Sequence, residues 1–223
     1  MIGAIILAGG AGLRLSALGK PKQFAEIRGK PLIGYALAAF EQCPDIDKIA
    51  VVAHEDWRAS IPAIGKFHAF AKPGRTRQHS VFSGLLAMRD VLSDNDLVIV
   101  HDAARPLVTA LDISECLRAV GGYDGATPAV RLKEAAYQSS DGTTIKSLLN
   151  RDELFAGQTP EAYRYGKYLM AHDNVDLAAI RGSSELAFKA GMAIRLFPGN
   201  PLNFKVTLAE DLDYLDFLLE RGK

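Results

Sequence analysis

Short apolar runs alternate with amphipathic segments along most of the chain. The apolar runs, at residues 2–8, 49–53, 97–100 and 126–130, have the continuous hydrophobicity of strands buried on both faces. Between them, apolar residues recur at helical spacing in segments 31–42, 57–66, 76–91 and 113–120. Strands that alternate with helices favour βαβ units with right-handed crossovers. We therefore expect an α/β fold, with a mostly parallel twisted sheet flanked by helices.

The alternation breaks between residues 131 and 158. Segments 135–138 and 143–148 have the pattern of two short strands, and the turn between them reads Ser-Ser-Asp-Gly. We expect a β-hairpin arm at 131–158, inserted in one domain that spans 1–223. So small an arm buries little surface by itself. It either packs on a second copy of the chain, as a homodimer, or folds back on its own domain.

After the arm the α/β character returns. Segments 192–197 and 203–207 have strand-like apolar character, and a last helix is expected from residue 208 to about residue 220.

Composition narrows the classes of function. The 223 residues include 26 Lys and Arg and 26 Asp and Glu, so the net charge is zero. A surface that binds nucleic acid or a membrane broadly normally shows a basic excess, so we do not expect one here. No apolar run reaches the length of a membrane span, and no charged segment precedes the first run. The two cysteines form no C-x-x-C pair, which favours the reducing cytoplasm and argues against structural zinc.

The loop after the first apolar run combines glycines with positive charge. Residues 8–14 read Ala-Gly-Gly-Ala-Gly-Leu-Arg, and Lys22 follows in Pro-Lys-Gln. Small residues let a backbone approach a phosphate or a base closely. The Walker pattern is absent, and the dinucleotide pattern fails because position 15 is leucine. A nucleoside triphosphate site and an ordinary strand-to-helix turn with surface cations both fit the glycines alone.

A second candidate site follows the strand at 97–100, where the chain reads HDAARP. Ligands of open α/β sheets bind beyond the carboxyl ends of the strands. Asp102 is therefore placed to hold Mg²⁺ against phosphates, and Arg105 could clamp a phosphate through two hydrogen bonds. The alternative is a helix-capping aspartate beside a surface arginine.

Lys205 is a cation within the otherwise apolar segment 203–207. It is either a solvated edge residue or a phosphate ligand, because an unpaired buried ammonium is costly. Ser80 and Ser83 have no evident histidine and acid partners, so the sequence does not support a hydrolase triad.

Five ordered motifs together resemble a known family. The chain contains LAGGAGLRL with PKQF, then RTRQHSVFSGL, HDAARP, GQTPEAY and NFKVTLAEDL. This set, which covers nearly the full length, is similar to the 2-C-methyl-D-erythritol 4-phosphate cytidylyltransferases. Their close relatives, the ribitol 5-phosphate cytidylyltransferases, share most of the motifs. The resemblance implies a Rossmann-like nucleotidyltransferase fold.

The resemblance also implies a reaction and a site. CTP and a polyol phosphate would give a CDP-alcohol and pyrophosphate with Mg²⁺, in non-mevalonate isoprenoid synthesis. Arg14, Lys22 and Lys205 would be the catalytic cations, and Asp102 would hold the metal. Lys205, Arg105 and Arg151 would bind the polyol phosphate, with Arg151 reaching across a dimer interface. The nucleotide would bind at Ala8, Gly9, Gly10, Ala11, Gly12, Gly74, Ser80 and Asp102.

The polyol side departs from the family pattern. Glu134-Ala135 replaces an Asp-Thr pair, residues 181–185 replace a Thr-Asp stretch, and Pro73 replaces the first glycine of a pair. Lost polar groups can shift substrate preference. Methylerythritol phosphate is the favoured alcohol, with ribitol phosphate or another alditol phosphate as the alternative. A sugar-phosphate uridylyl- or guanylyltransferase and a catalytically silent nucleotide-binding module are the other readings of these motifs.

Overall fold

A computed structural model describes residues 1–10, 19–173 and 175–222. Ala11, Gly12 and Arg14 lie outside the described residues, so their predicted roles stay predictions. The main sheet has the strand order β10-β7-β11-β6-β1-β4-β5, with β12 beside β7. Its strands are β1 (Ile2–Leu7), β4 (Lys48–Val52), β5 (Phe67–Ala71), β6 (Leu97–Asp102), β7 (Gly125–Arg131), β10 (Phe155–Gly157), β11 (Glu161–Arg164) and β12 (Ile194–Pro198).

Parallel pairing brings the two candidate loops together. Strands β5, β4, β1 and β6 are parallel neighbours, and Leu7 at the end of β1 lies opposite Asp102 at the end of β6. The loop that begins at Ala8 therefore starts beside Asp102. Strand β11 runs antiparallel to both β6 and β7, while β12 is parallel to β7. The predicted α/β fold with a mostly parallel sheet is confirmed.

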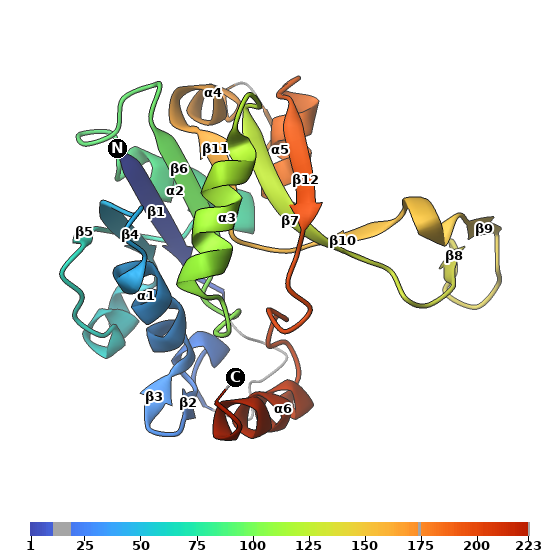
Figure 1. The fold of residues 1–223 in the computed structure, drawn as a ribbon, viewed down its shortest axis with the longest axis horizontal. Helices are drawn as coiled ribbons and strands as arrows, with labels where there is room; N and C mark the ends of the chain where they lie inside the picture. Colours follow the sequence, from blue (N-terminus) through green and yellow to red (C-terminus); the bar gives the residue numbers. More distant parts are fainter. Residues whose placement is uncertain (11–18, 174, 223) are drawn as a thin grey trace.

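Helices cover both faces of this sheet (Figure 1). On one face, α1 (Leu32–Gln42) and α3 (Ala110–Val120) bury a stripe of apolar side chains against the strands. The other face is covered by α2 (Arg77–Leu86), α4 (Tyr165–Met170) and α5 (Ser183–Lys189). Helix α6 (Ala209–Glu220) packs separately, with Leu215 against Leu32 and Val206. Within the described ranges, no helix is long and apolar enough to cross a membrane.

Short elements complete the fold. They are the 3₁₀ helices η2 (Lys22–Phe24), η3 (Glu55–Ser60) and η4 (Arg151–Glu153) and the strands β2 (Glu26–Ile27), β3 (Lys30–Pro31), β8 (Ala136–Gln138) and β9 (Ser147–Leu149).

The β8–β9 hairpin projects away from the α/β body (Figure 1). Its second strand starts later than the predicted residue 143. The backbone N–H groups of Thr143 and Thr144 both donate to Asp141 Oδ1 at 2.8 Å, which continues the turn and delays the pairing. The hairpin side chains Tyr137 and Leu148 are exposed.

Two other element predictions are wrong. Segment 203–207 is not a strand: its Val206 N–H donates to Ala104 O at 2.8 Å, but no ladder forms with the sheet. The predicted helix at 57–66 is only the 3₁₀ helix Glu55–Ser60. Pro62 has no N–H to donate and Gly65 has low helix propensity, so the helix cannot continue.

The contact between α2 and the sheet requires a glycine. A Cβ at Gly84 would lie 2.5 Å from Ile5 Cγ2 and 3.1 Å from Val52 Cγ2, both on buried strands. Gly84→Val should lower the free energy of unfolding by about 1–3 kcal/mol in urea titrations, because the core is overpacked. At exposed Gly122 an added Cβ meets nothing within 4 Å, so Gly122→Val is the control. Equal stability of the two variants would contradict this packing.

Candidate active site

A cavity of about 650 Å³ opens at the carboxyl ends of β1 and β6. It collects residues from the first loop, the segment before α2, the end of β6 and the C-terminal segment. The lining residues are Leu7, Gly9, Gly10, Lys22, Gln23, His54, Gly74, Arg75, Thr76, Arg77, Ser80, Asp102, Ala104, Lys205 and Thr207. The structure thus brings together Gly9, Gly10, Lys22, Gly74, Ser80, Asp102 and Lys205 from the sequence prediction.

The first loop is held by a side chain for which the sequence suggested no role. Gln23 is buried, and its Nε2 donates to Ala8 O at 2.6 Å and to Gly10 O at 2.8 Å. A Cβ at Gly9 would lie 2.3 Å from Pro73 Cβ, so only glycine permits this close approach. Ala8 itself is buried and does not line the cavity, while Gly9 and Gly10 present backbone to it.

The segment before α2 forms another wall of the cavity. Gly74 N–H donates to Ser80 Oγ at 3.1 Å, and Ser80 Oγ donates to Thr76 O at 3.0 Å. A Cβ at Gly74 would lie 2.2 Å from His79 Cβ. Thr76 also caps α2, since its side chain accepts from the His79 N–H. The Ser80 hydroxyl therefore shapes this wall in addition to lining it.

The C-terminal segment supplies Lys205 and supports Lys22. Lys22 Nζ donates to Val206 O at 2.6 Å, and Lys205 Nζ forms an ion pair with Asp102 Oδ2 at 2.6 Å. Both ammonium groups belong to residues that line the cavity. Residues far apart in the sequence thus place two cations in one site.

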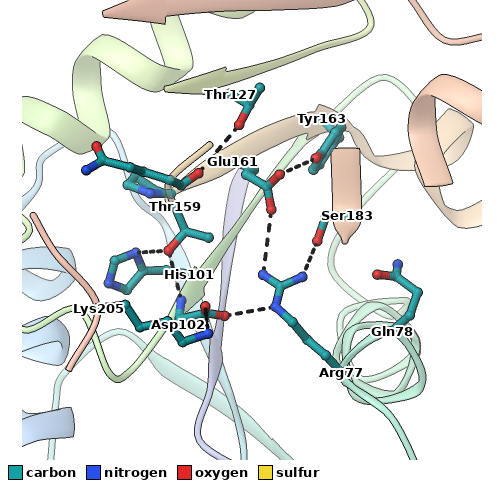
Figure 2. A network of polar contacts seen from close by, with 12 residues as sticks. Arg77, Gln78, His101, Asp102, Thr127, Thr159, Glu161, Tyr163, Ser183 and Lys205 are labelled. Atoms are coloured by element: carbon teal, nitrogen blue, oxygen red, sulfur yellow. Dashed lines mark hydrogen bonds and ion pairs between the residues drawn. The ribbon is translucent and has the colours of Figure 1, made fainter. Parts of the chain in front are cut away.

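Asp102 forms ion pairs with two cations (Figure 2). Besides Lys205, its Oδ1 accepts from Arg77 Nε at 3.0 Å. Burial alone would raise the pKa of Asp102, but Arg77 and Lys205 hold that pKa well below its usual range. The carboxylate is therefore ionised at neutral pH and can bind a cation.

Arg77 is a site residue that sequence analysis missed. Its guanidinium also lies 3.6 Å from Glu161 Oε2 and donates to Ser183 Oγ at 2.7 Å. Burial lowers the pKa of Arg77, but Asp102 and Glu161 outweigh it and raise the pKa. Burial raises the pKa of Glu161, and Arg77 opposes that rise. The only sequence signal was that both residues lie inside the RTRQHSVFSGL and GQTPEAY motifs.

His101 holds the backbone of Asp102 in place through hydrogen bonds that pass through Thr159. It is fully buried, and burial lowers its pKa to about 4, so the imidazole is neutral. Nε2 must donate to Arg105 O at 3.1 Å, because a carbonyl only accepts. Nδ1 then accepts from Thr159 Oγ1 at 3.1 Å, and that hydroxyl accepts the Asp102 N–H at 3.2 Å. His101 therefore orients the loop through these hydrogen bonds.

Two predicted substrate residues do not line this cavity. Arg105 donates from Nη1 to Asn203 O at 2.7 Å, a contact that ties the HDAARP loop to the C-terminal segment. Arg151, in η4 of the arm, donates to Lys133 O at 3.0 Å and is not among the residues that line the cavity of its own chain. Their predicted contact with substrate stays a prediction.

The donor set fits Mg²⁺ that is shared with a ligand. Across residues 1–10, 19–173 and 175–222, no group of three or more His, Cys, Asp or Glu residues could hold a metal. Asp102 nevertheless presents an ionised carboxylate to the cavity. Mg²⁺ commonly binds one or two carboxylates together with substrate phosphates and water. Among the described residues, Asp102 would therefore hold the ion jointly with a phosphorylated ligand.

Known proteins match this chain over nearly its whole length. A model of the 2-C-methyl-D-erythritol 4-phosphate cytidylyltransferase family matches residues 2–221. A relative of that name from Rubrobacter xylanophilus is 36% identical over 223 residues, covering 97% of this chain and 94% of the relative. Another from Geobacillus thermodenitrificans is 34% identical, covering 97% and 96%.

The comparison with solved structures points to the same family. The crystal structure of the Francisella tularensis 2-C-methyl-D-erythritol 4-phosphate cytidylyltransferase has a TM-score of 0.83 at 27% identity, covering 97% of this chain and 98% of that one. The fold, the sequence similarity over nearly the full length and the motifs that line the cavity all point to one family. This chain belongs to the 2-C-methyl-D-erythritol 4-phosphate cytidylyltransferase family.

Proposed function

We propose that this protein transfers the cytidylyl group of CTP to 2-C-methyl-D-erythritol 4-phosphate and releases pyrophosphate, as a step of isoprenoid precursor synthesis. One observation carries the proposal: a single cavity combines glycine backbone, Asp102 and the cations Lys22, Arg77 and Lys205. Such a site suits a polyanionic ligand, and the chain's relatives are named for this reaction. The two buried free cysteines are consistent with a cytoplasmic location.

The nucleotide would occupy the part of the cavity formed by the first loop and the segment before α2. Gly9, Gly10 and Gly74 present backbone where side chains would block a base or phosphate. Gln23 and Ser80 keep these two loops in place through hydrogen bonds to backbone groups. These hydrogen bonds would hold the backbone at Ala8, Gly10 and Gly74 in place for the nucleotide, which would reduce the entropy lost on binding.

The chemistry needs positioning and charge neutralisation. An oxygen of the polyol phosphate attacks the α-phosphorus of CTP and forms a new P–O bond. The bond from that phosphorus to the oxygen bridging to the β-phosphorus breaks, and pyrophosphate leaves with that oxygen. Lys22 would stabilise the crowded α-phosphate, because a fixed cation in a poorly solvated site stabilises developing negative charge strongly. The same role for Arg14, outside the described residues, remains a prediction.

Asp102 would hold Mg²⁺ together with the triphosphate. When bound, the ion supplies further neutralisation of the phosphate charges. Lys205, which pairs with Asp102 in this structure, could then turn toward the phosphate of the polyol. Arg105 would also need to turn from Asn203 O to reach that phosphate.

The arm would complete the polyol site of a partner subunit in a homodimer. Tyr137, Ile145, Leu148 and Leu149 are exposed on the arm, which projects from the body (Figure 1). Exposed apolar side chains gathered on a projecting hairpin favour an interface. Arg151 of one subunit would thereby reach the cavity of the other.

A substrate screen tests the reaction. With CTP and Mg²⁺, the protein should release pyrophosphate fastest with methylerythritol phosphate, more slowly with ribitol phosphate, and not with UTP or GTP in place of CTP. Coupled pyrophosphate detection measures the rates. Faster turnover of ribitol phosphate would change the assigned alcohol, and CTP binding without product over the whole panel would contradict the enzyme assignment.

Removing one phosphate-binding cation tests the assigned catalytic group. Lys22→Ala should lower kcat by roughly two to three orders of magnitude, as expected for loss of one transition-state donor. The thermal unfolding midpoint should change little. Lys20→Ala is the matched control, because Lys20 lies in the same segment but pairs with Glu26 and does not line the cavity. Near-normal kcat in Lys22→Ala would refute the role.

Mixing two inactive variants tests the contribution of the arm. If Arg151 acts across the interface, Lys22→Ala and Arg151→Ala subunits should form hybrid dimers with one intact site. Equal mixing after subunit exchange should restore about a quarter of wild-type activity, given random pairing. Light scattering should give twice the 24.1 kDa chain mass. A monomer, or no restoration in confirmed hybrid dimers, would contradict the assignment.

A further inference from the structure

Arg77 links two buried carboxylates that lie on neighbouring strands (Figure 2). It is the first residue of α2 and contacts Asp102 at the end of β6, Glu161 at the start of β11, and Ser183 on α5. Asp102 and Glu161 are only 7% and 5% exposed. With so little water, each carboxylate depends on nearby donors for stabilisation.

The two carboxylates differ in their access to the cavity. Asp102 lines it, whereas Glu161 does not. Glu161 is opposite Val100 in the β6–β11 pairing, and its Oε1 accepts from Tyr163 OH at 3.2 Å. Glu161 therefore lies outside the cavity but contacts Arg77, which lines it.

A metal ion would compete with Lys205 and Arg77, which each occupy one oxygen of the Asp102 carboxylate. Lys205 is about one-third exposed and can turn into the cavity toward a phosphate. Arg77 is more enclosed, and a buried guanidinium without a carboxylate partner is costly. Glu161 gives Arg77 a second carboxylate partner. The charge of Arg77 therefore stays paired when its contact with Asp102 weakens.

We infer that Glu161 is a positioning residue, which anchors Arg77 and so leaves Asp102 available to the divalent cation that enters with CTP. This inference rests on the proposed function, because the cation is the one that accompanies the nucleotide. Without the charge of Glu161, Arg77 keeps only Asp102 as a carboxylate partner. Arg77 then competes more strongly with the cation for Asp102.

A purely structural role makes a different prediction. If the Arg77–Glu161 pair only holds α2 against β11, its loss lowers stability and leaves cation binding unchanged. Cation affinity, measured without turnover, therefore separates the two roles.

The experiment is a Mg²⁺ titration at saturating CTP without polyol phosphate. Binding is followed by the thermal unfolding midpoint and by calorimetry, with wild type and Glu161→Gln compared. Glu161→Gln keeps the side-chain shape but removes the charge, and should raise the half-saturating Mg²⁺ concentration roughly tenfold. Asp216→Asn is the control, because Asp216 lies on α6 and the variant breaks only its exposed ion pair with Arg28. It should leave the value unchanged.

A double variant tests the route through Arg77. Arg77→Gln combined with Glu161→Gln removes the competitor along with its anchor. The half-saturating Mg²⁺ concentration should return to within about threefold of wild type, because no buried guanidinium is left to compete for Asp102. A value that stays as high as in Glu161→Gln alone would overturn the proposed route.

The remaining outcomes are also decisive. If Glu161→Gln lowers the melting temperature of the free protein but leaves the Mg²⁺ concentration within twofold, Glu161 is only structural and the inference is wrong. If that variant does not fold, Glu161→Asp keeps the charge but withdraws the carboxylate from Arg77, and an unchanged Mg²⁺ response there would refute the inference. A wild-type protein that CTP and Mg²⁺ do not stabilise would instead overturn the proposed function itself, and this inference with it.

Discussion

The balance of charge at the ends of β6 and β11 is the constraint on which the site depends. Two nearly buried carboxylates, Asp102 and Glu161, face two cations, Arg77 and Lys205. Removing Asp102, Glu161 or Arg77 would leave a largely buried charge with fewer partners, which is destabilising. The four residues come from α2, β6, β11 and the C-terminal segment, so the same interactions hold these segments around the cavity.

This constraint explains why the tail is irregular where it meets the site. Segment 203–207 reaches across the HDAARP loop, where Val206 N–H donates to Ala104 O and Asn203 O accepts from Arg105. Its apolar side chains Phe204 and Val206 pack with the α6 cluster instead of the sheet. Lys205 is thereby left to face Asp102. A regular strand would use the same backbone groups in a ladder with the sheet.

The sequence predicts the strands and their order better than it predicts the ion pairs of the site. Continuous apolar runs identify β1, β4 and β6, because strands buried on both faces need no polar alternation. Chain order then places the first loop beside Asp102, as parallel strands end at one edge. Segment 203–207 was misjudged because its alternating apolar pattern fits packing on α6 as well as on a sheet. Apart from lying inside two of the motifs, Arg77 and Glu161 gave no signal of their roles, since their partners are set by tertiary contacts and not by local spacing.

The central claim is that this cavity binds CTP with its phosphates among Lys22, Asp102 and Arg77. A crystal structure of the wild-type protein with CTP and Mg²⁺ tests it most directly. The account predicts that the α-phosphate lies within hydrogen-bond distance of Lys22 Nζ, that a Mg²⁺ ion bridges Asp102 and the phosphates, and that Arg77 keeps its contact with Glu161. Nucleotide bound elsewhere, or in this cavity with its phosphates away from Lys22 and Asp102, would contradict it.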